Sequence, residues 1–332
     1  MKPKNFAKIT IYTAVLMLFI CLLFSSMSTS FGELSFKPIP LQGQRGNGKL
    51  KLPEHEWVDG TYDMPWREKK RQMQAPTSLG EVGGGGGDPP DFVSWVGDWG
   101  LNIDYEQNFR WVMTGAHCYI YVAYDLGLNP LSYYDSVTDE YVFKNPYYID
   151  GETGGGWTPE DRISTAQLTY LMNEFDNTIY PTMTATFGFP DERPPGETKI
   201  YILIMNIRDE SYYDATQTSY VAGYFSWGED ADLNQNMVHI DSYDWANRIG
   251  PGVSRPYLYE GVFAHEFEHL IHNDIDAGEE SWVDEGCADF AMYICGYGHD
   301  AGHIAYYLLY HPWTSLTFWG GGLESYGASY LF

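Results

Sequence analysis

The chain has 332 residues, of which 44% are hydrophobic and 17% aromatic, enough apolar material for a globular core, which excludes a fully disordered protein. Its formal net charge is −26, with 45 acidic residues against 19 basic ones. Such a surface repels nucleic acid and anionic membranes, so we expect neither as a partner.

The first 30 residues are predicted to be an export signal. Three lysines and no acid open the chain, an apolar run from Ile9 to Phe24 follows, and small polar residues extend to Ser30. A membrane span needs about 20 apolar residues, so an uncleaved anchor is the minority interpretation. We expect cleavage near residues 28–32 and a secreted, extracellular protein, with association with the cell envelope as the alternative.

Two segments without regular structure are predicted before the main domain. Residues 31–79 are polar and interrupted by prolines, and they include the basic run Arg67–Gln72. Residues 80–91, GEVGGGGGDPPD, have the composition of a flexible tether. A signal, a basic segment, a tether and an acidic body are the order expected of an exported zymogen. A disordered spacer explains residues 31–79 equally well, so both interpretations stay open.

The remaining residues, 92–332, are predicted to form one domain of strands and helices. Alternating aromatic and β-branched residues predict a strand over 118–125, and a short apolar run predicts a buried strand over 199–207. Thr158 as N-cap and Pro159 in the first turn predict a helix over 158–181. Two more strands, 219–227 and 236–243, and two helices, 259–275 and 281–298, complete the prediction. Strands followed by helices indicate an α+β domain with a mixed sheet.

The first of these two helices carries the motif His265-Glu266-Phe267-Glu268-His269, which is H-E-x-x-H. Histidines four residues apart stand on one face of a helix, about 6 Å apart, so both rings can reach one metal ion. Glu266 then lies beside the metal, where it can accept a proton from water without being a ligand. Zn²⁺ suits this site because imidazole and carboxylate bind it at about 2.0–2.2 Å and leave one position open.

The third ligand is predicted to be a carboxylate. The metzincin pattern requires Gly at position 272 and His at position 275, where this chain has His272 and Ile275, so that class is excluded. Glu285 follows on the next helix, which can fold back against the first and complete a His₂Glu site. Asp289, one turn further, is placed to accept the second ring N–H of a ligand histidine.

The stretch from HEFEH to WVDEGCADFA resembles the gluzincin metallopeptidases. It is similar in particular to the hyicolysin-like and immune-inhibitor-like exported peptidases, whose pattern is near H-E-F-Q-H followed by W-x-N-E-G-x-A. The second piece is also similar to the third-ligand helix of aminopeptidase N. Glu268 and Asp284 depart from the Gln and Asn of the pattern, but neither stands at a ligand position. The likeness extends roughly from Asp161 to Phe332.

This resemblance implies a thermolysin-like zincin fold and a secreted zinc endopeptidase acting on peptides or proteins. His265, His269 and Glu285 would be the zinc ligands, and Glu266 would be the general base. Tyr326 is a candidate donor to the oxyanion because SYGAS is superficially similar to a catalytic segment of aminopeptidase N. The register differs, so packing on a helix is the alternative role for Tyr326. Further candidate donors are His299, His303 and His311.

Two other functions stay open. The first is an inactive exported binding or envelope protein that keeps the zincin fold, and the presence of Glu266 favours the enzyme over it. The second is an aminopeptidase, which would need an anchor for the free amine. The chain has no G-x-M-E-N-like segment of that kind.

Two local features complete the predictions. Residues 230–236 alternate oxygen-bearing side chains like a Ca²⁺ loop, but Gln235 stands where an EF-hand needs glycine, so a solvated acidic turn is favoured. The chain ends in the apolar, helix-like stretch YGASYLF. We therefore expect the sequence to stop inside the C-terminal helical part of the domain. Nothing in the sequence indicates an oligomeric state.

Overall fold

A computed structural model describes residues 56–59, 89–148, 160–217 and 219–332. They belong to one compact unit that extends from Leu52 to Phe332. The predicted export signal, most of the basic segment and the glycine tether up to residue 88 lie outside the described residues. Within the described ranges, no helix has both the length and the apolar character needed to cross a bilayer.

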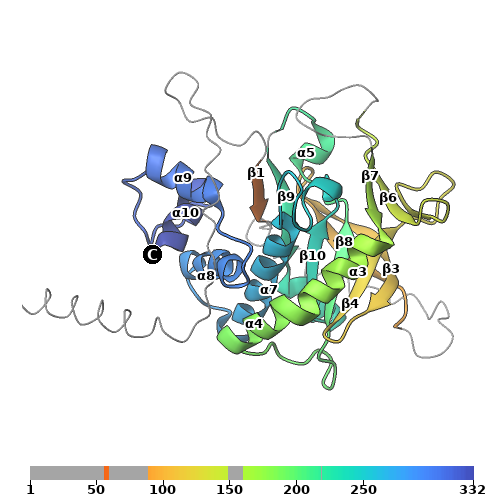
Figure 1. Ribbon diagram of the computed structural model, residues 1–332, viewed down its shortest axis with the longest axis horizontal. Coiled ribbons are helices and arrows are strands. Elements are labelled where there is room, and N and C mark those ends of the chain that lie inside the picture. Colours follow the sequence, from red (N-terminus) through yellow and green to blue (C-terminus); the bar gives the residue numbers. More distant parts are fainter. Residues whose placement is uncertain (1–55, 60–88, 149–159, 218) are drawn as a thin grey trace, which may run out of the picture. The chain divides into compact units, whose positions relative to one another are not determined.

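A mixed seven-stranded sheet organises the domain (Figure 1). Its strands lie in the order β1–β9–β10–β8–β4–β3–β2. β4, β8 and β10 run parallel at the centre, β9 is antiparallel to β10, and β1 is parallel to β9. On the other side β3 and β2 are antiparallel to their neighbours. The strands are β1 (Glu56–Asp59), β2 (Phe92–Asp98), β3 (Ile103–Thr114), β4 (Cys118–Tyr124), β8 (Ile200–Met205), β9 (Ser219–Phe225) and β10 (Met237–Asp241).

A second, three-stranded antiparallel sheet contains β5 (Ser132–Asp135), β6 (Glu140–Lys144) and β7 (Glu160–Ser164). The predicted strands near residues 118, 199, 219 and 236 are confirmed as β4, β8, β9 and β10. The α+β class is therefore confirmed. A helix also lies between the strands near residues 118 and 199, as predicted.

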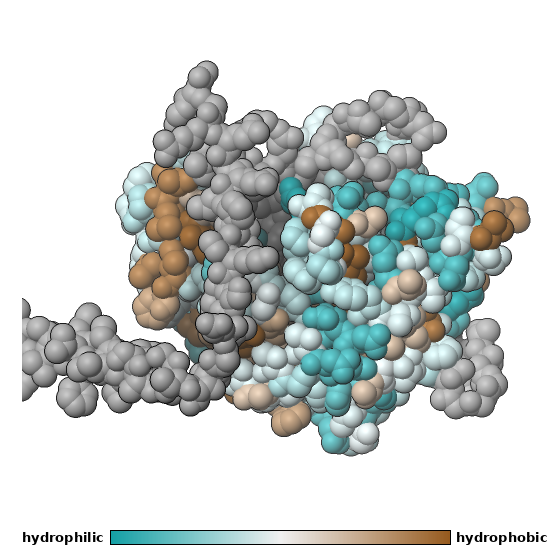
Figure 2. All heavy atoms as spheres, viewed as in Figure 1, coloured by the Kyte–Doolittle hydropathy of each residue, from teal (hydrophilic) through white to brown (hydrophobic). Residues whose placement is uncertain are grey.

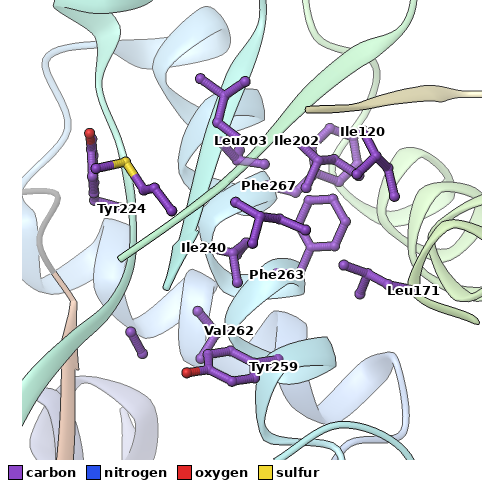
Figure 3. Packing of buried hydrophobic residues seen from close by; sticks show 14 of the residues in the cluster. Ile120, Leu171, Ile202, Leu203, Tyr224, Ile240, Tyr259, Val262, Phe263 and Phe267 are labelled. Carbon is purple, nitrogen blue, oxygen red and sulfur yellow. The ribbon is translucent and has the colours of Figure 1, made fainter. Parts of the chain in front are cut away.

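Helix α7 (Leu258–Asp276) packs against β9 and β10 of the seven-stranded sheet through buried apolar side chains, among them Phe263 and Phe267 (Figure 3). Phe263 and Phe267, one turn apart, contact Phe175 with ring centroids 4.6 and 5.3 Å away. Residues two positions apart on a helix point about 200° away from each other. His265 and His269 therefore face away from these phenylalanines, and the packing of the core fixes their direction.

The other helices are α3 (Thr165–Glu174), α4 (Tyr180–Thr186), α5 (Glu210–Tyr213), α6 (Trp227–Leu233), α8 (Ser281–Ile294), α9 (Ala301–Tyr310) and α10 (Leu323–Leu331). A five-residue π-helix, Phe175–Ile179, joins α3 to α4. The two predicted C-terminal helices are confirmed as α7 and α8.

The helix predicted from residue 158 begins later, at Thr165. Glu160–Ser164 pairs with β6 instead, and the Arg162 guanidinium lies 3.0 Å from the Glu140 carboxylate on that strand. Ser164 then starts α3 with a capping box, in which its hydroxyl accepts from the backbone N–H of Gln167. Cross-strand pairing thus overrides the helix-start signal of Thr158 and Pro159, which themselves lie outside the described residues.

Two further predictions are wrong. Residues 56–59, predicted to be irregular, form β1, because four residues are too few to show a periodicity in the sequence. Asp230 lies not in a solvated acidic turn but in helix α6, where it is buried and accepts a hydrogen bond from the Met237 N–H at 3.0 Å. The segment therefore does not have the form of a Ca²⁺ loop.

Apolar side chains gather on the surface of the C-terminal helices (Figure 2). The last turns of the chain form α10, as the helix-like ending predicts. Exposed apolar residues on and around α9 and α10 include Leu308, Leu309, Trp313, Phe318 and Phe332. This end of the domain thus contrasts with the acidic character of the chain as a whole.

Candidate metal centre

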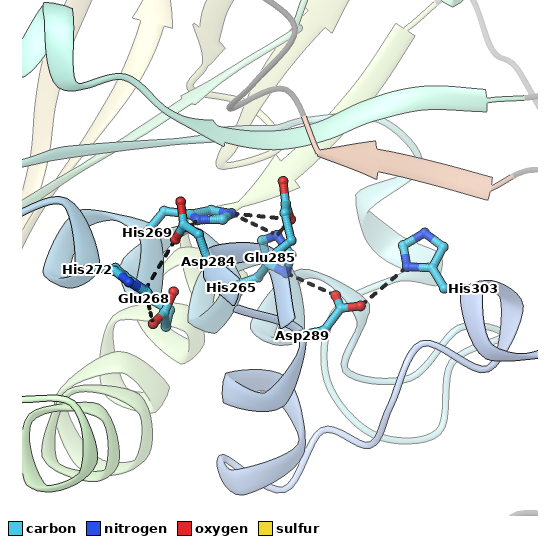
Figure 4. Close-up of polar contacts among 8 residues, drawn as sticks. All are labelled: His265, Glu268, His269, His272, Asp284, Glu285, Asp289 and His303. Atoms are coloured by element: carbon cyan, nitrogen blue, oxygen red, sulfur yellow. Dashed lines mark hydrogen bonds and ion pairs between the residues drawn. The ribbon is translucent and has the colours of Figure 1, made fainter. Parts of the chain in front are cut away.

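Helices α7 and α8 form a hairpin that brings the predicted site residues together (Figure 4). His265 and His269 stand one turn apart on α7. Glu285 and Asp289 stand one turn apart on α8. A turn of four residues, 277–280, separates the helices, so the two pairs face each other across the hairpin.

Three potential ligand atoms converge at the centre of this arrangement. The Nε2 atoms of His265 and His269 lie 3.1 Å apart, and Glu285 Oε2 lies 3.3 Å from the first and 3.6 Å from the second. All three side chains are buried, with 0 to 1% of their surface exposed. Ligands at about 2.05 Å around a tetrahedral ion stand roughly 3.3 Å apart, so these separations fit one Zn²⁺.

The opposite ring nitrogens are held by two carboxylates of α8. His265 Nδ1 lies 3.2 Å from Asp289 Oδ1, and His269 Nδ1 lies 2.9 Å from Asp284 Oδ1. A carboxylate accepts the Nδ1 proton, which leaves Nε2 with its lone pair. Two such lone pairs and a carboxylate oxygen within 3.6 Å repel one another unless a cation or a proton lies between them.

The electrostatics of His265 show the same need for positive charge. Burial lowers the pKa of His265, but the carboxylates of Asp289 and Glu285 outweigh it and raise that pKa well above its usual value. Burial also raises the pKa of Asp289, yet its hydrogen bonds to His265 and His303 lower it to about 2. These buried side chains thus attract positive charge, either a proton or a metal ion that replaces it.

Glu266 is buried next to this group, on the side of the sheet. Its Cγ would lie only 3.1 Å from a Cβ added to Gly223 of β9. The same added Cβ would lie 2.7 Å from Val262 Cγ1, so β9 and α7 are in direct contact at this point. Glycine at position 223 therefore allows the backbone of β9 to approach Glu266.

Two other groups of potential ligands occur among the described residues: Glu268 with His272 and Cys287, and Glu268 with His269 and Asp284. The His272 ring already lies 3.2 Å from Glu268 and 3.4 Å from Asp284. These contacts are those of a hydrogen-bonded network behind His269. The group of His265, His269 and Glu285 differs because all its members are buried and two imidazoles face a carboxylate.

Tyr326, the candidate oxyanion donor, lies among aromatic side chains. It is buried on α10, with its ring 4.9 Å from that of His303 and 4.8 Å from that of Trp319. His303 in turn lies 3.6 Å from Asp289. These are the contacts of a packed side chain, and the role of Tyr326 as an oxyanion donor stays a prediction.

The supporting position of Asp284 is not predicted from the sequence. There the residue is only a departure from a family pattern, whereas in the structure its carboxylate reaches His269. The available signal was its place next to Glu285 on the facing helix. No feature of the sequence indicates that His303 lies behind Asp289, because the position of His303 depends on how α9 packs.

No family model matches the chain. Over 150 residues it is 25% identical to the neutral metalloprotease ShpI of Staphylococcus hyicus, a match that covers 42% of this chain. The chain is a distant relative of a metalloprotease.

The match covers only 33% of the length of ShpI. The relationship supports the metallopeptidase part of the predicted resemblance, and the cluster of His265, His269 and Glu285 is compatible with a bound metal ion. The identity of the metal, the gluzincin type and the substrate do not follow from ShpI.

The contact between Asp289 and His265 gives a first testable expectation. Asp289→Asn removes the charge that holds the His265 ring, so we expect the affinity for zinc to fall about 10- to 100-fold. Competition with a fluorescent chelator measures this change. Asp232→Asn on the exposed surface of α6 is the matched control and should leave the affinity unchanged. Equal affinities of both variants would contradict a supporting role for Asp289.

Proposed function

We propose that the chain is a secreted zinc-dependent endopeptidase of the gluzincin type, with a zincin fold. The observation that carries the proposal is the convergence of His265, His269 and Glu285, whose buried Nε2 and Oε2 atoms lie 3.1 to 3.6 Å from one another. The distant relationship to a neutral metalloprotease supports it. The export signal predicted from residues 1–30 supports secretion.

The donor set favours zinc among the common divalent ions. Two imidazoles and one carboxylate are the ligands of catalytic zinc sites, whereas Ca²⁺ and Mg²⁺ prefer oxygen ligands alone. Each imidazole is backed by a carboxylate of α8, Asp289 for His265 and Asp284 for His269. Such support fixes the orientation and tautomer of a ligand ring and increases its basicity.

In the proposed mechanism, zinc held by these ligands would act as a Lewis acid toward the peptide carbonyl and lower the pKa of water at its open position. Glu266 acts as the general base, taking a proton from the attacking water and passing it to the departing amine. Glu266 is buried next to β9, and its negative charge acts on the His265 ring. His265, His269 and Glu285 would act as ligands and would transfer no proton in these steps.

The products of digestion test this proposal against the two alternatives. The zinc-loaded protein is incubated with an unfolded protein substrate, and the fragments are identified by mass spectrometry. We expect internal cleavages that disappear with a chelator and return with zinc. Stepwise loss of N-terminal residues alone would favour an aminopeptidase. Absence of any product from zinc-loaded protein freed of its first 79 residues would favour an inactive binding protein.

A further inference from the structure

The short strand β1 lies far along the sequence from the strand with which it pairs. Glu56–Asp59 runs parallel to β9, whose first residue is Ser219. β9 pairs with β10 along its inner side, so β1 covers the outer side of β9. Without β1, the outer backbone groups of β9 would form the edge of the sheet. An unpaired edge of this kind is a template for another extended chain.

This edge borders the candidate metal centre. Gly223 of β9 approaches the side chain of Glu266 so closely that an added Cβ would lie 3.1 Å from Glu266 Cγ. Asp59 of β1 stands opposite Gly223, after a shift of register that follows Val58. Neighbouring strands of a sheet lie about 4.8 Å apart. The backbone of β1 therefore lies about that far from the part of β9 that approaches Glu266. Figure 4 shows the β1 arrow beside β9, above Glu285 in that view.

The covalent link keeps β1 near its docking site, because a tethered segment has an effective concentration of the order of millimolar there.

The pairing itself is suited to release. β1 has four residues and runs parallel to β9, and parallel ladders are slightly less stable per residue than antiparallel ones. Such a short strand depends on its tether to remain bound. A cut in the chain after Asp59 removes the tether and frees the edge beside Glu266.

We propose that the outer edge of β9 is a docking site for an extended peptide segment, that Glu56–Asp59 fills it in the uncleaved chain, and that this occupancy keeps the peptidase latent. The docking stands on the strand pairing alone, and the latency rests on the function proposed above. A peptide substrate that approaches Glu266 along β9 meets the backbone of β1, so the two compete for one edge.

Proline substitution tests the docking in the full chain. Proline has no N–H for a ladder, and adjacent residues of a strand direct their N–H groups to opposite sides, so Trp57→Pro combined with Val58→Pro removes one donor that faces β9. Thr61→Pro combined with Tyr62→Pro, beyond the strand, is the matched control. We expect hydrogen exchange of Ser219–Phe225 to become at least about tenfold faster in the first variant only. Unchanged exchange would overturn the docking.

Peptide hydrolysis tests the latency with the same proteins. We expect the first variant to cleave a quenched fluorescent peptide at least about tenfold faster than the control, and an added synthetic peptide of residues 52–62 to suppress this gain. Faster exchange without faster cleavage, in a control protein that does cleave, would overturn the latency. If zinc-loaded protein of both kinds cleaves nothing but β9 still responds in exchange, the docking is supported and the proposed function fails.

Discussion

Glu266→Gln should abolish peptide hydrolysis while leaving zinc bound. Glutamine keeps the size of the side chain beside Gly223 but cannot accept a proton from water. General-base catalysis contributes about 10²- to 10⁴-fold, so we expect kcat to fall at least about a hundredfold. Because Glu266 is not among the three converging side chains, zinc content should stay equal to that of the unaltered protein.

Glu268→Gln is the matched control for this experiment. It makes the same chemical change two residues along α7, where the Glu268 carboxylate contacts His272. We expect it to keep at least half of the activity. Equal losses in the two variants would show that any change of charge on α7 impairs the enzyme, and Glu266 would lose its assigned role.

Glu285→Gln should remove most of the affinity for zinc. The carboxylate of Glu285 is the sole negative charge among the three converging groups, and it is fully buried. Loss of a supporting carboxylate typically costs 10- to 100-fold in affinity, so the loss of a ligand should cost more than about a hundredfold. Activity should fall with zinc occupancy and should recover partly at high zinc concentration. Chelator competition and peptide hydrolysis measure the two effects on one preparation.

Glu280→Ala, at the exposed start of α8, controls for a general effect on that helix. Its side chain makes no capping hydrogen bond, so both zinc affinity and activity should stay unchanged. Zinc affinity that is the same in Glu285→Gln and the unaltered protein would remove Glu285 from the proposed ligand set. Thermal unfolding of the metal-free proteins separates loss of zinc from loss of the fold.

The helix hairpin is the part of the site that the sequence predicts well. Apolar residues at positions such as Phe263 and Phe267 define the core face of α7, which places His265 and His269 on the opposite face. The helical period then fixes which side chains of α7 and α8 share a face. Glu285 lies near both histidines for this reason.

The parts that could not be predicted depend on contacts between distant segments. β1 has too few residues for a detectable pattern, and it exists because the outer side of β9 offers backbone partners. Glu160–Ser164 carries helix-start residues, but pairing with β6 makes it a strand. Tertiary hydrogen bonds outweigh local preferences in both segments.

The contacts behind the ligands show the same limit. Asp284 and His303 support His269 and Asp289 through the packing of α8 and α9. A single sequence contains these residues but not the distances between them. The family pattern even directs attention away from Asp284, because it marks the residue as a departure.

The zinc content of the purified protein tests the central claim most directly. Elemental analysis after equilibration with a zinc buffer should find one zinc ion for each chain, because His265, His269 and Glu285 form one buried group. Less than about one tenth of an ion per folded chain under these conditions would contradict the account, since a proton would then take the place of the metal ion among the three converging acceptors.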